Sequence, residues 1–126
     1  MDRNEKVIFG IKGESKNGHS AAIYQFDVYP KEFNFEECES KCVYIYAKEA
    51  TTPSGISYEP LYVGETERLP ERLKEHERGD SKSDECIRNS GYTHILVYNC
   101  DSSDKRLYVE NDIRRGNDCP CNKQGN

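Results

Sequence analysis

The sequence lacks features that mark several common classes of protein. Its 126 residues contain no apolar run approaching the ~20 residues that a membrane-spanning helix needs. Residues 2–6 are polar, and no apolar stretch of signal-peptide length follows them, so we expect a cytoplasmic protein without a membrane segment. Excess positive charge is also absent. The 18 Lys and Arg against 23 Asp and Glu give a net charge of −5, which argues against coating nucleic acid through bulk positive charge.

Large aliphatic residues are scarce as well. Leu, Ile, Val and Phe make up 23 of the 126 residues. That share lies just under the ~20% below which a highly charged chain is suspected of disorder. Nine tyrosines add large apolar area, however, and the charge is of both signs. We therefore expect one folded, very polar domain.

Six cysteines are present, and none has the spacing of a zinc knuckle. We expect reduced thiols, because the cytoplasm keeps cysteines reduced. One alternative stays open, in which two close pairs, Cys38 with Cys42 and Cys119 with Cys121, form a four-thiolate zinc site.

Hydrophobic periodicity predicts an α+β fold, an α/β sandwich with a β-hairpin followed by the order β-β-α-α-β-α. The predicted strands cover residues 7–11, 21–29, 43–47, 60–64 and 94–98. A turn at Gly13–His19 joins the first two. The predicted helices cover residues 66–78, residues 83–89, and a third segment that opens within 101–104 and ends at Gly116. We expect residues 1–41 to add a hairpin to the domain, residues 42–122 to form its core, and residues 123–126 to fray.

Helix signals support these boundaries. Thr66 is a candidate N-cap, and Pro70 lies in or near the first turn, where a missing N–H costs little. Gly79 is a candidate C-terminal stop. In the last helix Val109 and Ile113 are four residues apart and form one apolar stripe.

Several residues on these elements can carry chemistry together. Tyr44 and Tyr62 lie on adjacent strands, while Arg72 and His76 are four residues apart on the next helix and so share a face. Gly64 follows the second of these strands, where a missing Cβ allows a close backbone approach. The last helix and the final turn contribute Glu110 and Asn122.

These residues resemble the motifs of the GIY-YIG endonuclease domain. The motifs follow the family order: Cys42-Val43-Tyr44, Tyr62-Val63-Gly64-Glu65-Thr66, Arg72-Leu73-x-x-His76, Glu110 and Asn122. The resemblance covers residues 42–122. It implies a central antiparallel β-sheet flanked by helices, with a DNA-hydrolysing site on one face.

The resemblance implies a metal-dependent DNA endonuclease with assigned roles. Phosphodiester hydrolysis places extra negative charge on the phosphoryl oxygens and the leaving 3′ oxygen, so Arg72 would stabilise the transition state. Glu110 would hold one Mg²⁺ or Mn²⁺ ion. Tyr44, supported by Tyr62 and His76, would position and activate the attacking water. In a variant of this scheme His76 is itself the general base, because its pKa suits proton transfer at neutral pH.

The remaining expectations concern the site's edge and its partners. Asn122 would brace the site by hydrogen bonding. In structural terms, Arg72 could simply pair with Glu75, and Glu110 lies four residues from both Arg106 and Arg114. Residues 66–115 contain ten Lys and Arg against eleven Asp and Glu, so we expect DNA to be bound weakly or with the help of a protein partner. The alternative function is a catalytically inactive binding module that acts through a protein partner.

Overall fold

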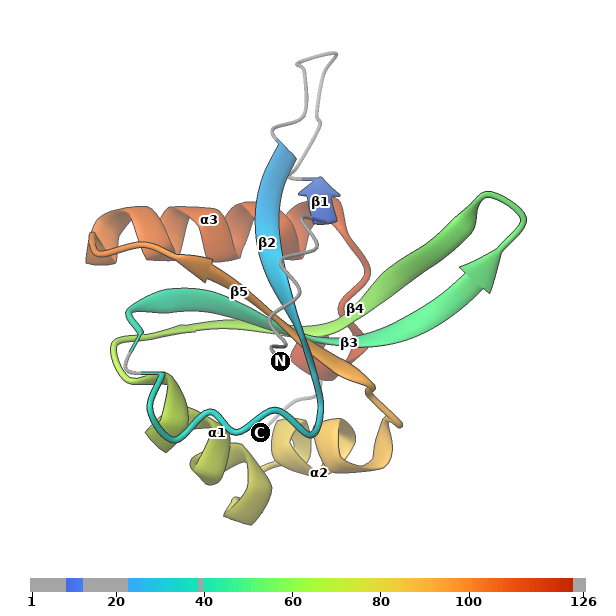
Figure 1. Ribbon diagram of the computed structural model, residues 1–126. Coiled ribbons are helices and arrows are strands. Elements are labelled where there is room, and N and C mark those ends of the chain that lie inside the picture. Colours follow the sequence, from blue (N-terminus) through green and yellow to red (C-terminus); the bar gives the residue numbers. More distant parts are fainter. Residues whose placement is uncertain (1–8, 13–22, 39, 124–126) are drawn as a thin grey trace.

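The computed structural model describes residues 9–12, 23–38 and 40–123 (Figure 1). Its strands are β1 (Phe9–Lys12), β2 (Ile23–Pro30), β3 (Cys42–Thr52), β4 (Gly55–Thr66) and β5 (His94–Asn99). The helices are α1 (Leu69–Arg78), α2 (Lys82–Asn89) and α3 (Ser103–Gly116), and a short 3-10 turn, η1 (Pro120–Lys123), follows them.

The strands form an antiparallel sheet in the order β1-β2-β5-β3-β4, with helices on both of its faces. The predicted α+β class and the antiparallel sheet flanked by helices are confirmed. Pairing of β1 with β2 agrees with the predicted N-terminal hairpin. The turn predicted at residues 13–19 lies outside the described residues. Strand β3 pairs with β4 on one side and β5 on the other, so residues of β3 lie at the centre of the domain.

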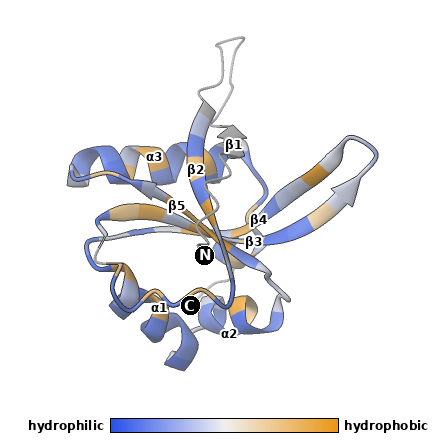
Figure 2. Ribbon diagram, viewed as in Figure 1, coloured by the Kyte–Doolittle hydropathy of each residue, from blue (hydrophilic) through white to orange (hydrophobic). Residues whose placement is uncertain are grey.

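The sheet separates two cores. Alternate side chains of a strand point to opposite faces, so Val43 and Ile45 join the core under α3, whereas Tyr44 and Tyr46 join the core under α1 and α2. Figure 1 shows α3 on one side of the sheet and the two shorter helices on the other. In Figure 2 the hydrophobic residues concentrate in the central strands, and the helices are largely hydrophilic.

The hairpin of β3 and β4 is longer than the sequence predicts. Its strands continue to Thr52 and restart at Gly55, beyond the predicted 43–47 and 60–64. The extension carries mainly exposed or half-buried residues such as Lys48 and Glu59, which pair through their backbones. Because that pairing needs no apolar pattern, hydrophobic periodicity misses it. Gly55 has a φ of 125°, a backbone conformation that favours glycine.

The helix ends follow their sequence signals in most cases. α1 begins at Leu69 rather than near Thr66, because Thr66 bonds the backbone of Arg68 and turns the chain before the helix starts. Pro70 lies in the first turn and Gly79 ends the helix, as predicted. Ser102 caps α3 through the N–H of Lys105, and the predicted Val109–Ile113 stripe is buried. Within the described part of the chain, no helix has the length and apolar character needed to cross a membrane.

Two of the six cysteines are joined, so the expectation of free thiols is wrong for that pair. Cys86 of α2 and Cys121 of η1 form a disulfide, with Cα atoms 5.4 Å apart. The packing of α2 against η1 brings together two residues that are 35 positions apart in the sequence. The proposed four-thiolate zinc site is also ruled out in this form, because Cys121 is bonded elsewhere, and Cys42 and Cys119 belong to the cores on opposite faces of the sheet.

Candidate active site

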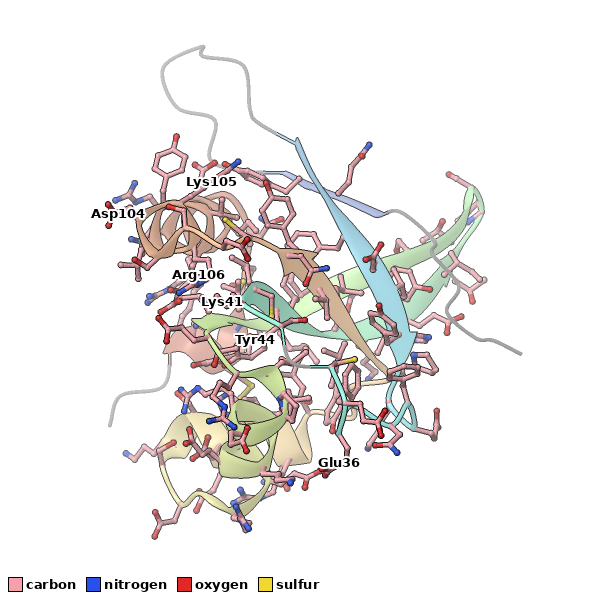
Figure 3. The ribbon with its side chains drawn as sticks, turned by 60° about the vertical axis from the view of Figure 1, so that its left-hand side comes forward. Glu36, Lys41, Tyr44, Asp104, Lys105 and Arg106 are labelled. Carbon is pink, nitrogen blue, oxygen red and sulfur yellow. A yellow bond between two sulfur atoms is a disulfide. The ribbon has the colours of Figure 1, made fainter. Side chains whose placement is uncertain are left out.

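A chain of three side chains runs from the centre of the sheet to the start of α2. Tyr44 is fully buried, and its Oη lies 2.7 Å from His76 Nε2. The other ring nitrogen, Nδ1, lies 2.8 Å from Asp84 Oδ1. An ionised carboxylate can only accept a hydrogen bond, so Nδ1 carries the imidazole proton. Nε2 is then an acceptor for the Tyr44 hydroxyl, which lies between the sheet and α1 (Figure 3).

Asp84 is held in place by the N-terminus of α2. The Oγ of Ser81, the N-cap, accepts a hydrogen bond from the Asp84 N–H at 3.1 Å. A Cβ at Gly79 would collide with the Asp84 carboxylate, so this close approach requires glycine. Burial acts to raise the pKa of Asp84, but hydrogen bonds with His76 and Ser81 outweigh burial and hold that pKa below its ordinary value.

His76 is neutral at neutral pH in this setting. Burial is the main cause that lowers its pKa below the ordinary value of 6.5, and the nearby charge of Arg72 lowers it further. The hydrogen bond with Asp84 opposes both effects without reversing them. A neutral imidazole with a fixed tautomer is a proton acceptor at Nε2.

Arg72 lies beside both predicted tyrosines. The rings of Tyr44 and Tyr62 have centroids 6.3 Å apart. Burial raises the pKa of each phenol, and the Arg72 guanidinium acts to lower it through its charge and through hydrogen bonding. Arg72 also forms the ion pair with Glu75 that the sequence suggests, with Nη1 and Oε1 2.7 Å apart. The guanidinium therefore has a structural partner and also faces the phenols.

Gly64 makes room for the Tyr44 hydroxyl. The two residues are register partners on β3 and β4. A Cβ at position 64 would lie 2.5 Å from Tyr44 Oη, a separation that real Cβ contacts do not show. The sequence predicts a close backbone approach at Gly64, and the structure shows that the group occupying this space is the Tyr44 side chain.

Glu110 lies on α3 near the same group. Its side chain is 17% exposed, and an oxygen lies 3.9 Å from Arg114 Nη1. Burial raises the pKa of Glu110, and the charge of Glu65 adds to this, while Arg114 and Arg72 act in the opposite direction. Arg106 is not part of this pairing. It is buried, with its Nε 2.9 Å from Glu65 Oε1.

Asn122 bonds the backbone of β4 and takes no part in the hydrogen bonds that join Tyr44, His76 and Asp84. Its Oδ1 accepts the N–H of Val63 at 2.8 Å, and its Nδ2 donates to the carbonyl of Val63 at 2.9 Å. β4 is an edge strand, and the amide occupies backbone groups that β3 leaves unpaired. The adjacent Cys121 ties η1 to α2. Asn122 is therefore a positioning residue for the strand that carries Tyr62 and Gly64.

The donor set at Glu110 suits Mg²⁺ or Mn²⁺ rather than a metal that needs a closed cage. Mg²⁺ binds through one or two carboxylates and keeps several waters. Glu110 supplies one half-buried carboxylate whose pKa is raised mainly by burial, and a bound cation would offset that cost of holding the charged form. Among the described residues no three His, Cys, Asp or Glu are grouped to hold a metal by themselves.

The structure thus gathers Tyr44, Tyr62, Arg72 and His76 around one point, with Glu110 at its edge and Asn122 behind it. The functional candidate that sequence reasoning missed is Asp84. Its only sequence signal is a capping pattern, Ser81-x-x-Asp84, which predicts a helix start and no chemistry. The chain matches no protein-family model, and neither a curated protein nor a solved structure matches it.

Proposed function

We propose that this protein is a metal-dependent endonuclease that hydrolyses phosphodiester bonds in DNA. The observation that carries the proposal is the hydrogen-bonded chain Tyr44–His76–Asp84, which ends at a phenol faced by Arg72. A buried tyrosine, a buried histidine and a half-buried aspartate in series provide a route for one proton. A guanidinium beside the phenol provides a place for an anionic group.

The proton route defines the roles of the three residues. Tyr44 takes a proton from the attacking water while its own hydroxyl proton passes to His76 Nε2. His76 becomes an imidazolium, and the Asp84 carboxylate at 2.8 Å stabilises that charge. Burial keeps the phenol protonated at rest, because it raises the pKa of Tyr44. The Arg72 guanidinium acts to lower that pKa, and a cation held at Glu110 would act in the same direction.

Charge stabilisation falls to Arg72 and Glu110. The fixed donors of Arg72 would bind the phosphoryl oxygens as negative charge develops on them. Glu110 would hold Mg²⁺ or Mn²⁺, which supplies Lewis-acid stabilisation of the leaving 3′ oxygen when bound.

Local charge supports a weakly bound polyanion. A groove lined by Arg114, Arg115, Lys123 and Asn122 offers cations to a phosphate backbone, although Arg114 already pairs with Glu110 and Lys123 with Asp118. A second, shallow groove is lined by Arg72 and Arg68 and also by Glu67, Glu71 and Glu75, whose carboxylates repel a phosphate backbone. A net charge of −5 leaves these few cations as the source of attraction, so DNA binding should be weak and salt-sensitive, or aided by a protein partner.

The test is cleavage of supercoiled and branched DNA with Mn²⁺, comparing the wild-type protein with Glu110→Ala and Arg72→Ala. Loss of one transition-state donor is expected to lower the rate by about 10²–10³-fold. Glu85→Ala is the matched control, since Glu85 is an exposed glutamate of α2 that lines neither groove. Unfolding in urea checks that all variants are folded.

The alternative, a catalytically inactive module that acts through a protein partner, expects a different result. Neither supercoiled nor branched DNA would then be cut by the wild-type protein with either metal. That outcome, with the protein folded and pure, would overturn the endonuclease proposal.

A further inference from the structure

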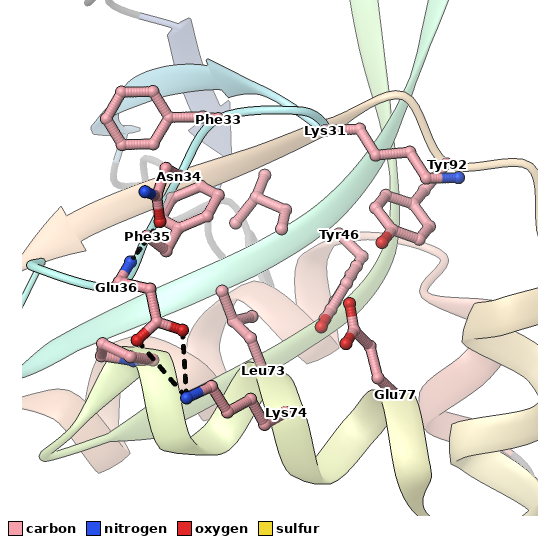
Figure 4. A pocket seen from close by; sticks show the side chains of 12 residues that line it. Lys31, Phe33, Asn34, Phe35, Glu36, Tyr46, Leu73, Lys74, Glu77 and Tyr92 are labelled. Atoms are coloured by element: carbon pink, nitrogen blue, oxygen red, sulfur yellow. Dashed lines mark hydrogen bonds and ion pairs between the residues drawn. The ribbon is translucent and has the colours of Figure 1, made fainter.

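A separate cleft lies between α1 and segment 31–36, which leads from β2 toward β3 (Figure 4). Its floor is formed by Phe35, Leu73 and Ile95, whereas Arg72 lies on another side of the helix. The cleft has a volume of about 180 Å³. Sites for drug-sized ligands are larger, about 300–1,000 Å³, so this cleft suits a single flat ring system.

One end of the cleft gathers polar groups that do not satisfy one another. Tyr46 is 2% exposed, and its hydroxyl makes no hydrogen bond to another described residue. Its ring is fixed by edge-on contacts with Tyr92 and His76, at centroid distances of 4.7 and 5.5 Å. Buried polar groups normally have partners, because leaving one unsatisfied destabilises the folded state. The Tyr46 hydroxyl therefore points to a ligand.

Glu77 reaches the same end of the cleft. Figure 4 shows its carboxylate beside the Tyr46 hydroxyl and below Tyr92. The Glu77 charge raises the pKa of both phenols, which places the carboxylate close to them. Within the described ranges, no cation pairs with Glu77. The end of the cleft thus presents a carboxylate acceptor and two phenol hydroxyls to whatever enters.

The charges at the rim define the rest of the ligand. Lys31 Nζ lies 4.5 Å from the centroid of the Tyr92 ring, and no carboxylate of the described residues pairs with it. Lys74 pairs with Glu36 across the opposite rim at 3.0 Å. A cationic ligand would bind over the face of the Tyr92 ring, but Lys31 already occupies that face and would repel it. The favoured ligand combines N–H donors on a flat ring with an anionic group for Lys31.

We propose that this cleft binds a guanine base, with Glu77 accepting from its donor edge and Lys31 facing its phosphate. Guanine presents two adjacent N–H donors, at N1 and at the exocyclic amine, which match the two oxygens of one carboxylate. Adenine places an acceptor beside its donor on that edge, and the acceptor would meet the carboxylate oxygen. The apolar floor covers the ring, and the Tyr46 hydroxyl completes the polar end.

The base can come from a free nucleotide or from a guanine in a single strand, and the recognition chemistry is the same. This proposal does not depend on the endonuclease proposal, because none of the cleft's polar residues belongs to the site at Tyr44. Cleavage assays and guanine binding therefore fail or succeed separately.

The experiment is titration of the full-length protein with guanosine and adenosine 5′-monophosphates, followed by tyrosine fluorescence and NMR. We expect guanosine monophosphate to bind at least tenfold more tightly than the adenosine compound. Glu77→Gln is expected to abolish this preference, whereas Glu71→Gln, on the exposed side of the same helix, leaves it unchanged. A second arm compares a thymine oligonucleotide with one that contains a single guanine. Glu77-dependent tightening there identifies nucleic acid as the source, and binding of the mononucleotide alone identifies a free nucleotide.

Tyr46→Phe separates a binding role from a structural one. Because the hydroxyl is buried without a partner, its removal should leave the free energy of unfolding unchanged or raise it. The same variant should lose guanosine monophosphate affinity about tenfold. No binding by the wild-type protein at millimolar guanosine monophosphate, or equal binding of both nucleotides that Glu77→Gln does not alter, overturns the proposal.

Discussion

The two faces of the sheet are made from alternate residues of the same strands, yet they bury different chemistry. Under α3, Val43, Ile45 and Ile113 form a core of apolar side chains. Under α1 and α2, Tyr44 and His76 are equally buried but joined by a hydrogen bond. Apolar contacts are non-directional, whereas buried polar groups must be aimed at their partners. The core under α3 can therefore supply stability, with Glu110 of α3 reaching the edge of the site, while the other face fixes the positions of the tyrosine and histidine atoms.

This division explains how a chain with few aliphatic residues folds and still carries a polar site. More of the buried aliphatic side chains lie under α3 than under α1 and α2, where Leu69, Leu73 and Ile87 pack with aromatic rings. On the α1–α2 face the rings of Tyr44 and Tyr46, 6.1 Å apart and nearly perpendicular, provide the buried area that aliphatic side chains would otherwise supply. The tyrosines thus serve packing and proposed chemistry at once.

Tyr44→Phe should give the largest effect on the α1–α2 face. It removes the hydroxyl that passes a proton to His76, so we expect DNA cleavage to slow by about 10²–10⁴-fold. The free energy of unfolding should fall by only about 1–3 kcal/mol, because His76 Nε2 loses a buried partner. Rates with Mn²⁺ and urea unfolding measure the two effects. Tyr29→Phe is the control, because it removes a hydroxyl elsewhere on the same face, and it should cleave DNA at the wild-type rate. Wild-type cleavage by Tyr44→Phe would exclude the proton route.

Ile113→Ala tests the opposite face. Ile113 is fully buried under the sheet, and its truncation should lower the free energy of unfolding by about 2–5 kcal/mol. Ile113→Val should cost about 0.5–1.5 kcal/mol. The cleavage rate per folded molecule should be unchanged at a temperature where each variant is folded. A slower rate in the fully folded Ile113→Val protein would contradict the division between the faces.

The sequence predicts the strands and helices better than it predicts what lies between them. Periodicity locates the buried halves of β3 and β4, but their exposed extension has no apolar pattern to reveal it. Helical spacing correctly predicts that Arg72 and His76 share a face, because both are on one helix. Asp84 lies on the next helix, and its reach to His76 depends on how tightly the turn at Gly79 folds back. Such a contact between elements leaves no local signature.

Loss of the Cys86–Cys121 disulfide should have a smaller effect, which lowers stability and also weakens the support that Asn122 gives to β4. Replacing both cysteines by serine is expected to lower the free energy of unfolding by about 2–4 kcal/mol. The substitution also releases η1 from α2, so the two hydrogen bonds between Asn122 and the Val63 backbone should contribute less to the free energy of unfolding. Urea unfolding of Asn122→Ala, alone and in the serine background, measures this coupling. A reducing agent should reproduce the loss in the wild-type protein and leave the serine variant unchanged. An equal cost of Asn122→Ala in both backgrounds would show that the disulfide does not support these hydrogen bonds.

Asp84→Asn should give the smallest change in cleavage rate. It tests whether Asp84 stabilises the charge on His76 during proton transfer. In the wild-type protein cleavage should rise with pH through the pKa of His76, which lies below its ordinary value of 6.5 mainly because of burial. Asp84 acts to raise that pKa, so removing its charge moves the acid limb to still lower pH. The plateau rate should fall about tenfold, because the imidazolium loses the carboxylate that stabilises it.

The same substitution distinguishes proton handling from simple packing, because the carboxylate and the amide are nearly equal in size. A purely structural Asp84 would change the free energy of unfolding and leave the position of the acid limb where it was. Stability itself should decline in the wild-type protein as pH falls below about 6.5, since the unfolded chain protonates His76 more readily than the folded one. His76→Gln should flatten that decline between pH 7 and pH 5. A decline of equal slope in His76→Gln would assign the acid sensitivity to other groups and remove His76 from the account.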